Sequence, residues 1–115
     1  MRRGEVCLVD LDPVRGNEAN KRRPAVVVSN DRANAVAERL GRGIVTVVPL
    51  TSNTARTFPF QVLVPADQGC LRVDSKALAE QVRSVAVERL GPALGQFSAS
   101  VMVDIDDALR LHLDL

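Results

Sequence analysis

The sequence predicts an α+β domain built around a strongly curved antiparallel sheet. Five or six short apolar runs are separated by turn-forming residues, a pattern typical of short strands in one sheet. Helical apolar spacing appears in one short segment and at the C-terminus, and a further short helical turn is expected between two strands. At 115 residues the chain is long enough for one hydrophobic core. We therefore expect residues 1–115 to form a single domain.

The first strands alternate with polar loops. Residues 5–11 form a short β-rich run that stops at Asp12-Pro13, and Pro24 opens a continuous apolar run over residues 25–28. The polar segment 14–23 between them predicts a loop, and a loop of this length in a small domain is usually functional. Residues 44–50 predict another buried strand, followed by a polar loop over residues 51–57.

A short helix is expected before the strand at residues 44–50. Asn30 or Asp31 can cap its start, and Gly41 ends it. The spacing i, i+3, i+4, i+7 predicts an apolar face that packs on the core. This face consists of Ala33, Val36, Ala37 and Leu40.

The second half predicts three more strands and a terminal helix. Residues 58–64 alternate and stop at Pro65, residues 67–69 form a turn, and residues 78–87 are interpreted as one long strand. A short helical turn is expected near residues 87–90, and Gly91-Pro92 interrupts the strand. Residues 93–97 are expected to form a last short strand. Ser98 caps a C-terminal helix. Its apolar face runs through Val101, Met102, Ile105, Ala108 and Leu109, with His112 at its edge.

Charge is unevenly distributed along a nearly neutral chain. The formal net charge is +1, but residues 1–60 carry ten basic and six acidic side chains, whereas residues 61–115 carry five basic and eight acidic ones. The first half therefore carries +4 and the second −3. A locally basic surface can still attract a polyanion, because electrostatic fields fall off within about 8 Å at physiological salt.

Cysteine use and hydropathy point to the cytoplasm. Cys7 and Cys70 have no metal-type spacing, and we expect both to be reduced thiols. The apolar run Val6–Val9 is too short for a secretion signal, and no segment approaches the roughly 20 apolar residues that a membrane span needs. We expect a cytoplasmic protein with no membrane partner.

Several kinds of chemistry lack their residues. His112 is the only histidine, so a zinc site or a histidine-based nucleophilic triad is not expected. Neither a phosphate-binding glycine motif nor a dinucleotide fingerprint is present. Asp104 and Asp107 are interpreted as a solvated helix surface rather than a cation site. We therefore predict no metal ligands and no cofactor.

Four motifs follow one another along the chain. They are Arg3–Val6 with Val9–Pro13 and Gly16; Lys21–Asp31; Val48–Thr54; and Asp74-Ser75 with Glu80–Val85. In this order they resemble toxins of the MazF/PemK type. Any one motif is weak, but together they span the chain, and the last helix, with Asp106–Leu111, is similar to the terminal helix of that family. Residues 98–102 depart from the family, whose helices tend to begin with more acidic residues.

The resemblance implies a fold, an activity and partners. It implies an SH3-like barrel of five to six curved antiparallel strands, with two short helices and a C-terminal helix, dimerised so that single-stranded RNA lies in a groove at the dimer. It further implies a toxin whose cognate antitoxin places a flexible acidic segment in that groove. Cleavage would use the 2′-hydroxyl of the substrate and leave 2′,3′-cyclic phosphate and 5′-hydroxyl ends. The catalytic residues of the family correspond to Arg23 and Thr51.

The chemistry of these residue types agrees with that assignment. An enzyme that uses the 2′-hydroxyl of RNA needs neither a protein nucleophile nor a metal, only orientation and charge stabilisation. A guanidinium offers a planar set of donors to phosphate oxygens, and a Thr hydroxyl can bind the same phosphate. Because a guanidinium stays protonated, we do not assign the general base to Arg23. Glu18 or an ordered water are the alternatives.

Further polar residues are candidates for RNA binding. They are Arg15, Asn17, Glu18, Lys21, Arg22, Ser52, Asn53, Gln81 and Arg83. With no Trp, no Tyr and three Phe, we expect bases to be held by polar groups and Arg planes more than by aromatic rings.

Each assignment has a structural alternative. Lys21–Arg23 can be a solvated loop, Thr51 and Ser52 can end a strand, and Gln81 and Arg83 can be exposed strand positions. A same-fold gyrase poison without nuclease activity is the alternative function. An SH3-like interaction module is a weaker one, because such modules use exposed aromatic residues.

Overall fold

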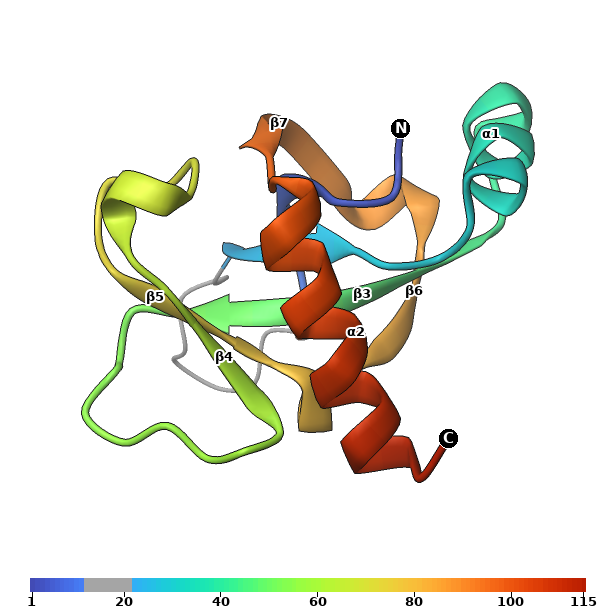
Figure 1. Cartoon of the computed structure of the whole chain (residues 1–115). Coiled ribbons are helices and arrows are strands. Elements are labelled where there is room, and N and C mark those ends of the chain that lie inside the picture. Colours follow the sequence, from blue (N-terminus) through green and yellow to red (C-terminus); the bar gives the residue numbers. More distant parts are fainter. Residues whose placement is uncertain (12–21) are drawn as a thin grey trace, which may run out of the picture.

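A curved antiparallel sheet of seven strands forms the body of the protein, and two α-helices pack beside it (Figure 1). The computed structural model describes residues 1–11 and 22–115. The strand order is β4-β5-β3-β2-β1-β7, and β6 also pairs with β3. Among the described residues no pairing joins the end strands β4 and β7, so the expected barrel is seen as an open curved sheet. The strands are β1 Glu5–Asp10, β2 Arg22–Val27, β3 Ile44–Thr51, β4 Gln61–Val64, β5 Ser75–Leu78, β6 Arg83–Ala86 and β7 Leu90–Gln96.

The long strand expected over residues 78–87 is wrong, because β3 pairs with two separate strands along the same edge. Val47 pairs with Arg83 of β6, and Leu50 pairs with Ala77 of β5. Three steps along β3 thus correspond to six steps along its partner. The extra residues form the 3₁₀ turn Ala79–Gln81, so the partner of β3 is interrupted by a turn rather than running straight.

Two other strand boundaries differ from the sequence prediction. The fourth strand begins at Gln61 rather than residue 58, since Phe58 and Gln61 close a turn in which the Gln61 amide donates to the Phe58 carbonyl at 2.9 Å. The last strand runs through Gly91-Pro92 instead of starting after it. Proline is tolerated there because β7 lies at the edge of the sheet, and its register with β1 is irregular.

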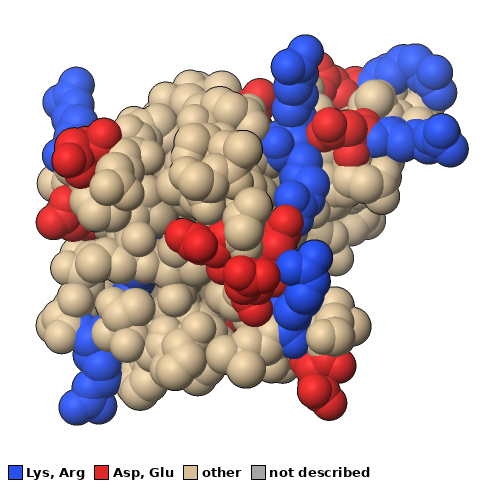
Figure 2. Space-filling model, in the orientation of Figure 1, with Lys and Arg blue, Asp and Glu red and all other residues tan. Residues whose placement is uncertain are grey.

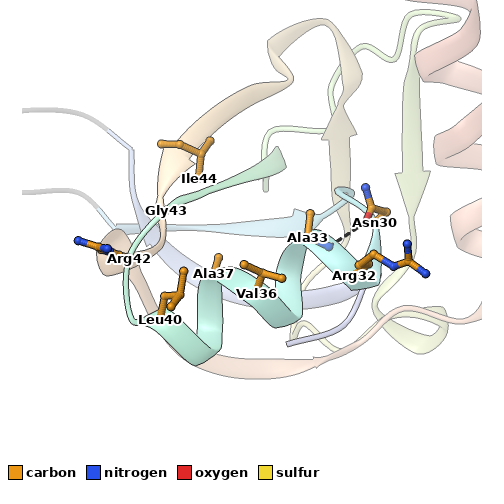
Figure 3. Close-up of a pocket in the computed structure, with 9 residues that line it drawn as sticks. All are labelled: Asn30, Arg32, Ala33, Val36, Ala37, Leu40, Arg42, Gly43 and Ile44. Atoms are coloured by element: carbon orange, nitrogen blue, oxygen red, sulfur yellow. Dashed lines mark hydrogen bonds between the residues drawn. The ribbon is translucent and has the colours of Figure 1, made fainter.

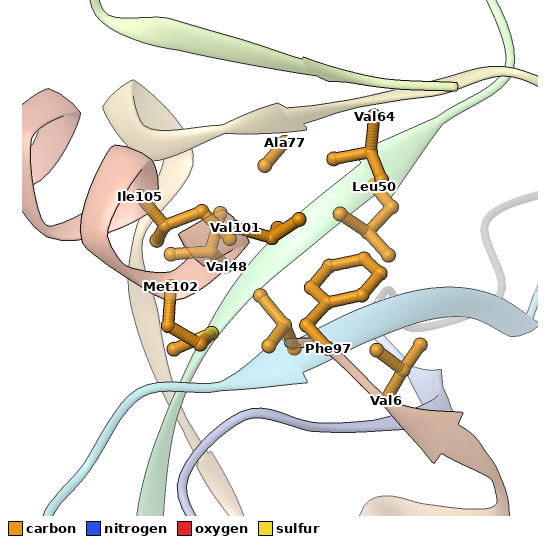
Figure 4. Packing of buried hydrophobic residues seen from close by; sticks show 10 residues of the cluster. Val6, Val48, Leu50, Val64, Ala77, Phe97, Val101, Met102 and Ile105 are labelled. Atoms are coloured by element: carbon orange, nitrogen blue, oxygen red, sulfur yellow. The ribbon is translucent and has the colours of Figure 1, made fainter. Parts of the chain in front are cut away.

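The main core lies between the sheet and α2, Ala99–Leu113 (Figure 4). Ser98 caps this helix as predicted, and its hydroxyl accepts a hydrogen bond from the Val101 amide at 3.3 Å. The predicted apolar face is confirmed: Val101, Met102, Ile105 and Ala108 are buried and Leu109 is partly buried. His112, predicted at the edge of this face, is exposed.

A second core occupies the other face of the sheet. It contains the valines of β1, β2, β3 and β6 that alternate with those of the main core, and Ala37 of α1, Asp31–Leu40, packs on it. The predicted caps of α1 are confirmed, because the Asn30 side chain accepts from the Ala33 amide and Gly41 adopts a left-handed conformation at the other end.

The expectation that the apolar face of α1 packs on the core is wrong for most of its residues. Ala37 is buried, but Val36 is 41% exposed and Leu40 is 54% exposed. The helix is turned so that Asn34 is buried instead. The Asn34 side chain donates to the Ser29 carbonyl at 2.9 Å and accepts from the Ser29 hydroxyl. Two hydrogen bonds therefore satisfy a buried amide and set the rotation of the helix.

The thiols are shielded and unpaired. Cys7 is buried in β1 and Cys70 is partly buried. Burial raises the pKa of the Cys7 thiol to about 11 and also raises the pKa of Cys70. Within the described ranges, no helix is long and apolar enough to cross a membrane.

Truncating Ile105 tests the role of α2 in the main core. Ile105 is 0% exposed, so Ile105→Ala should lower the free energy of unfolding by about 2–5 kcal/mol through lost burial and a residual cavity. Val103 lies on the same helix and is 55% exposed, so Val103→Ala should change stability by less than about 0.5 kcal/mol. Urea denaturation measures both. Equal destabilisation by the two variants would contradict the packing described here.

Candidate active site

The pairing of β2 with β3 sets the geometry of the two predicted catalytic residues. Ala25 pairs with Pro49, Val26 with Val48 and Val27 with Val47. Continuing this register by two residues places Arg23 opposite Thr51, at the end of β3. Directly opposite residues of an antiparallel pair direct their side chains to the same face. The sequence predicts Arg23 just before a strand and Thr51 just after one, whereas both are strand residues.

Pro24 ends the hydrogen-bonded ladder next to this pair. The Val28 amide donates to the Thr46 carbonyl at 2.9 Å, so the nitrogens of alternate residues back along β2 also face β3. Pro24 belongs to this series and has no N–H. The recorded pairing of β2 with β3 accordingly stops at Ala25, while Arg23 remains paired with Val9 of β1. Arg23 and Thr51 therefore lie two residues beyond the last residue pair, Ala25 and Pro49, at which β2 and β3 are paired.

Lys76 extends the arrangement on the other side of Thr51. Thr51 pairs with Lys76 of β5, so the two side chains also share a face. Neighbouring strands are about 4.8 Å apart, which separates the Cα atoms of Arg23 and Lys76 by about 10 Å. We call Arg23, Thr51 and Lys76 the cross-strand row. The sequence patterns did not identify Lys76, and the only signal for it is a lysine within the otherwise small or apolar segment 75–79.

The Lys76 side chain is buried beneath the loop that follows Thr51. The residue is 9% exposed, and its ammonium donates a hydrogen bond to the backbone carbonyl of Arg56. A buried ammonium needs such partners, because its removal from water is costly. Lys76 thus carries a largely buried positive charge on the strand next to Thr51, and its hydrogen bond holds the loop over residues 52–60 at Arg56.

Thr51 presents a hydroxyl at the start of this loop. It is half-buried, and its Oγ1 accepts from the Asn53 amide at 3.2 Å. The side-chain oxygen Oδ1 of Asn53 accepts in turn from the Ala55 amide at 3.3 Å. Accepting a hydrogen bond leaves the hydroxyl hydrogen of Thr51 able to donate to a ligand. Ser52 and Asn53 are both exposed.

The remaining predicted site residues divide between two faces. Arg83 is exposed and pairs with Val47, so it lies on the face of the cross-strand row, four residues back along β3. Arg22 is exposed, but as the neighbour of Arg23 it lies on the opposite face. Gln81 is exposed in the turn between β5 and β6. Arg15, Asn17, Glu18 and Lys21 lie outside the described residues.

The face covered by α2 is poorly suited to a polyanion. Figure 2 shows acidic side chains gathered in the middle of this face, where α2 runs in Figure 1. Asp106 of this helix forms an ion pair with Arg3, and Asp107 forms one with Arg110 at 3.2 Å. Cations on this face are thus partly neutralised.

A groove lies away from this row. It has a volume of about 470 Å³ and runs along α1, where Val36, Leu40 and Ile44 form an apolar floor and Arg32 and Arg42 form the rim (Figure 3). It holds no group suited to acid–base or nucleophilic chemistry. Among the described residues, no three His, Cys, Asp or Glu side chains come together as a metal site would require. Among the described residues, the cross-strand row is therefore the candidate site.

Comparisons with known proteins give a consistent result. Residues 2–113 match a family model described as PemK-like, MazF-like toxin of type II toxin–antitoxin system. The chain is 64% identical over 115 residues to endoribonuclease MazF9 of Mycobacterium tuberculosis, covering all of this chain and 98% of the relative. It is 36% identical to endoribonuclease MazF of Staphylococcus epidermidis, again over all of this chain and 92% of the relative.

Solved structures show the same similarity. A mycobacterial endoribonuclease in complex with its cognate antitoxin superimposes with a TM-score of 0.78 at 27% identity, over all of this chain and 96% of that chain. A MazE–MazF structure from Deinococcus radiodurans gives a TM-score of 0.79 at 29% identity, over all of this chain and 96% of that chain. The fold described above is thus similar to the folds of solved structures named as an endoribonuclease and as MazF.

An engineered disulfide tests the register of the site. Opposite residues without mutual hydrogen bonds have Cα atoms about 4.5 Å apart, which is within the range a disulfide can bridge. The double variant Arg23→Cys with Thr51→Cys should therefore oxidise to an intramolecular disulfide, detected by peptide mass spectrometry. Arg22→Cys with Thr51→Cys is the matched control, because its side chains lie on opposite faces. Preferential linking of the control pair would show that the register is shifted by one residue.

Proposed function

The chain belongs to the PemK-like, MazF-like toxins of type II toxin–antitoxin systems, and we propose that it acts as a sequence-specific endoribonuclease on single-stranded RNA. One observation carries the choice of residues. The β2–β3 register, continued by two residues, brings Arg23 opposite Thr51 on one face of the sheet. An Arg fork beside a Thr hydroxyl is a donor set matched to a phosphodiester. The catalytic pair is therefore Arg23 and Thr51.

The proposed reaction takes its nucleophile from the substrate. The 2′-oxygen attacks the adjacent phosphorus, the bond from phosphorus to the 5′-oxygen breaks, and the products are a 2′,3′-cyclic phosphate and a 5′-hydroxyl. The 2′-hydroxyl proton passes to a base, Glu18 or an ordered water. The departing 5′-oxygen takes up a proton from the Arg23 guanidinium or from water, which balances the proton lost by the 2′-hydroxyl. Arg23 stabilises the charge that grows on the phosphate oxygens, and Thr51 donates a hydrogen bond to one of them.

The surroundings of the pair support this electrostatic role. Lys76, which is 9% exposed, is the cross-strand neighbour of Thr51, and charges act more strongly on one another away from bulk water. Thr51 and Lys76 are strand residues in one continuous sheet, and Arg23 is held by β1. Donors held in this way need little rearrangement when the phosphate changes charge, which is the main requirement of such catalysis.

The other candidate residues extend the site along the RNA. We assign RNA contacts to Arg15, Asn17, Glu18, Lys21, Arg22, Ser52, Asn53, Gln81 and Arg83 on the resemblance stated above. Arg83 shares the face of the cross-strand row and lies about 13 Å from Thr51, four residues back along β3. Arg22 lies on the opposite face of β2, at the first residue of this strand. It would therefore reach the RNA only by extending around the end of the strand.

The family gives the chain a cognate antitoxin as partner. We propose that a flexible acidic segment of this antitoxin covers the cross-strand row, because carboxylates can occupy the positions of phosphates beside Arg23 and Lys76. We further propose a cytoplasmic homodimer with RNA in a groove between the subunits. Two-fold pairing is the commonest assembly of small soluble proteins. The gyrase poison is set aside, since relatives 64% and 36% identical to the chain are both named endoribonucleases.

Removing either catalytic side chain should abolish most of the activity. Arg23→Ala and Thr51→Ala should each lower cleavage by at least roughly a hundredfold, the usual effect of losing one preorganised donor. Both variants should keep the wild-type free energy of unfolding to within about 0.5 kcal/mol, as measured by urea denaturation. Arg42→Ala, an exposed arginine beside α1 at the far end of β3, is the control and should cut normally. Near wild-type cleavage by Thr51→Ala or Arg23→Ala would remove that residue from the mechanism.

The sugar next to the cut should decide whether a strand is cleaved. An oligonucleotide with a single 2′-deoxy sugar 5′ to the scissile phosphate should bind as RNA does, since phosphate contacts supply most of the affinity. It should resist cleavage, because it lacks the attacking oxygen. Mapping of 5′-hydroxyl ends and detection of cyclic phosphate by mass spectrometry measure the outcome, and activity should persist in EDTA. Cleavage of the deoxy strand, or dependence on added magnesium, would contradict the mechanism.

A further inference from the structure

A stacked group of planar side chains lies in the loop that follows Thr51. The rings of Phe58 and Phe60 stack with centroids 5.5 Å apart and an interplanar angle of 6°. The Arg56 guanidinium carbon lies over the Phe58 ring, 5.8 Å from its centroid. On the other side Phe60 contacts the ring of His112, with centroids 6.2 Å apart. We call Arg56, Phe58 and Phe60 the loop stack.

The loop stack is placed at the surface rather than in the core. Phe58 is 42% exposed and Arg56 is exposed, whereas Phe97, the third phenylalanine of the chain, is 3% exposed. A buried Phe normally contributes to the core in proportion to the apolar surface it removes from water. Two of the three Phe side chains thus lie in a surface loop, where they contribute less to the hydrophobic core than Phe97 does.

Several hydrogen bonds hold this part of the loop in one conformation. Lys76 donates to the Arg56 carbonyl, and the Phe58 amide donates to the Gln61 side chain at 3.1 Å. Gln61 also donates from its side chain to the carboxylate of Glu80 and from its backbone to the Phe58 carbonyl. A surface that is already ordered loses little conformational entropy when a ligand binds. The loop stack therefore has the preorganisation of a binding surface.

The loop stack also lies within reach of the proposed catalytic pair. Thr51 pairs with Lys76, and Gln61 pairs with Leu78 two residues further along β5 on its other side. Two strand spacings and two residue steps separate the Cα atoms of Thr51 and Gln61 by about 12 Å. Lys76 connects the two regions directly, because its backbone pairs with Thr51 and its side chain holds Arg56. A short single strand bound at Thr51 can extend to the stack.

We propose that the loop stack is a base-binding subsite that holds a nucleobase of the RNA near the scissile phosphate; this inference rests on the ribonuclease function proposed above. Every base has a flat face that stacks on aromatic rings, and an Arg plane adds both stacking and attraction for phosphate. Single-stranded RNA exposes its bases for such contacts, whereas duplex RNA does not. The subsite therefore favours unpaired substrate and contributes to the choice of base at one position.

A single-tryptophan variant gives a direct readout of stacking. The chain contains no Trp and no Tyr, so Phe58→Trp introduces one indole whose fluorescence reports only on this position. The ligand is a single-stranded oligonucleotide that the wild type cuts, made uncleavable by one 2′-deoxy sugar at the scissile position. We expect saturable quenching by this strand, and loss of the quenching when one nucleotide near the cut is abasic. Ile44→Trp is the control, because Ile44 is 60% exposed at the opposite end of β3, and it should not be quenched.

Steady-state kinetics give an independent measurement. Phe58→Ala should raise KM for a short RNA roughly tenfold, in line with the loss of one stacked base, and should leave kcat largely unchanged. Phe58→Leu keeps apolar bulk without a ring, so a purely structural role would be rescued by it and a stacking role would not. Unchanged thermal unfolding of both variants shows that the loop still packs.

The two proposals fail in different ways. If the wild type cuts RNA but Phe58→Ala keeps its KM and Phe58→Trp is not quenched, the subsite is overturned and the ribonuclease mechanism stands. If Phe58→Leu restores the KM, the ring serves the fold and the subsite is likewise overturned. If the wild type does not cut RNA, a single-stranded RNA of mixed sequence serves as the ligand. Quenching of Phe58→Trp by this RNA, and not by the same strand made fully abasic, then supports the subsite and overturns the proposed reaction.

Discussion

The backbone pairing of β3 is the constraint on which the rest of the structure depends. This strand pairs with β2 along one edge and with β6 and then β5 along the other. Residues far apart in the sequence therefore meet across it in fixed register, and the side-chain period of two decides which of them share a face. A shift of one residue would move Thr51 to the face of the main core and separate it from Lys76.

The pairing is interrupted on both sides of β3. Pro24 removes a donor at the edge that β2 presents to β3, and the turn Ala79–Gln81 inserts three residues between β5 and β6. The sheet remains continuous on either side, so the side chains at its open end are held by rigid strands. A reaction that depends on preorganised donors rather than on a protein nucleophile needs this combination of rigidity and access.

The two faces of the sheet divide the charges of a nearly neutral chain. One face is covered by α2, whose carboxylates pair with Arg3 and Arg110, and the other presents the cross-strand row. The net charge of +1 therefore understates the attraction that a phosphate meets beside Arg23 and Lys76. Because fields are screened within about a Debye length, the local arrangement outweighs the total.

The sequence by itself determined the local structure and the family. Period and capping predicted α2 with its buried Ile105, the caps of α1 at Asn30 and Gly41, and the central strand around Val47, because these signals depend on neighbouring residues. The ordered motifs identified the toxin family. Only the tertiary structure decided that residues 78–87 are divided, that Val36 and Leu40 are exposed, and that Lys76 lies beside Thr51 and holds Arg56. These outcomes follow from long-range strand register and from competition among buried groups for partners, which spacing along the chain does not encode.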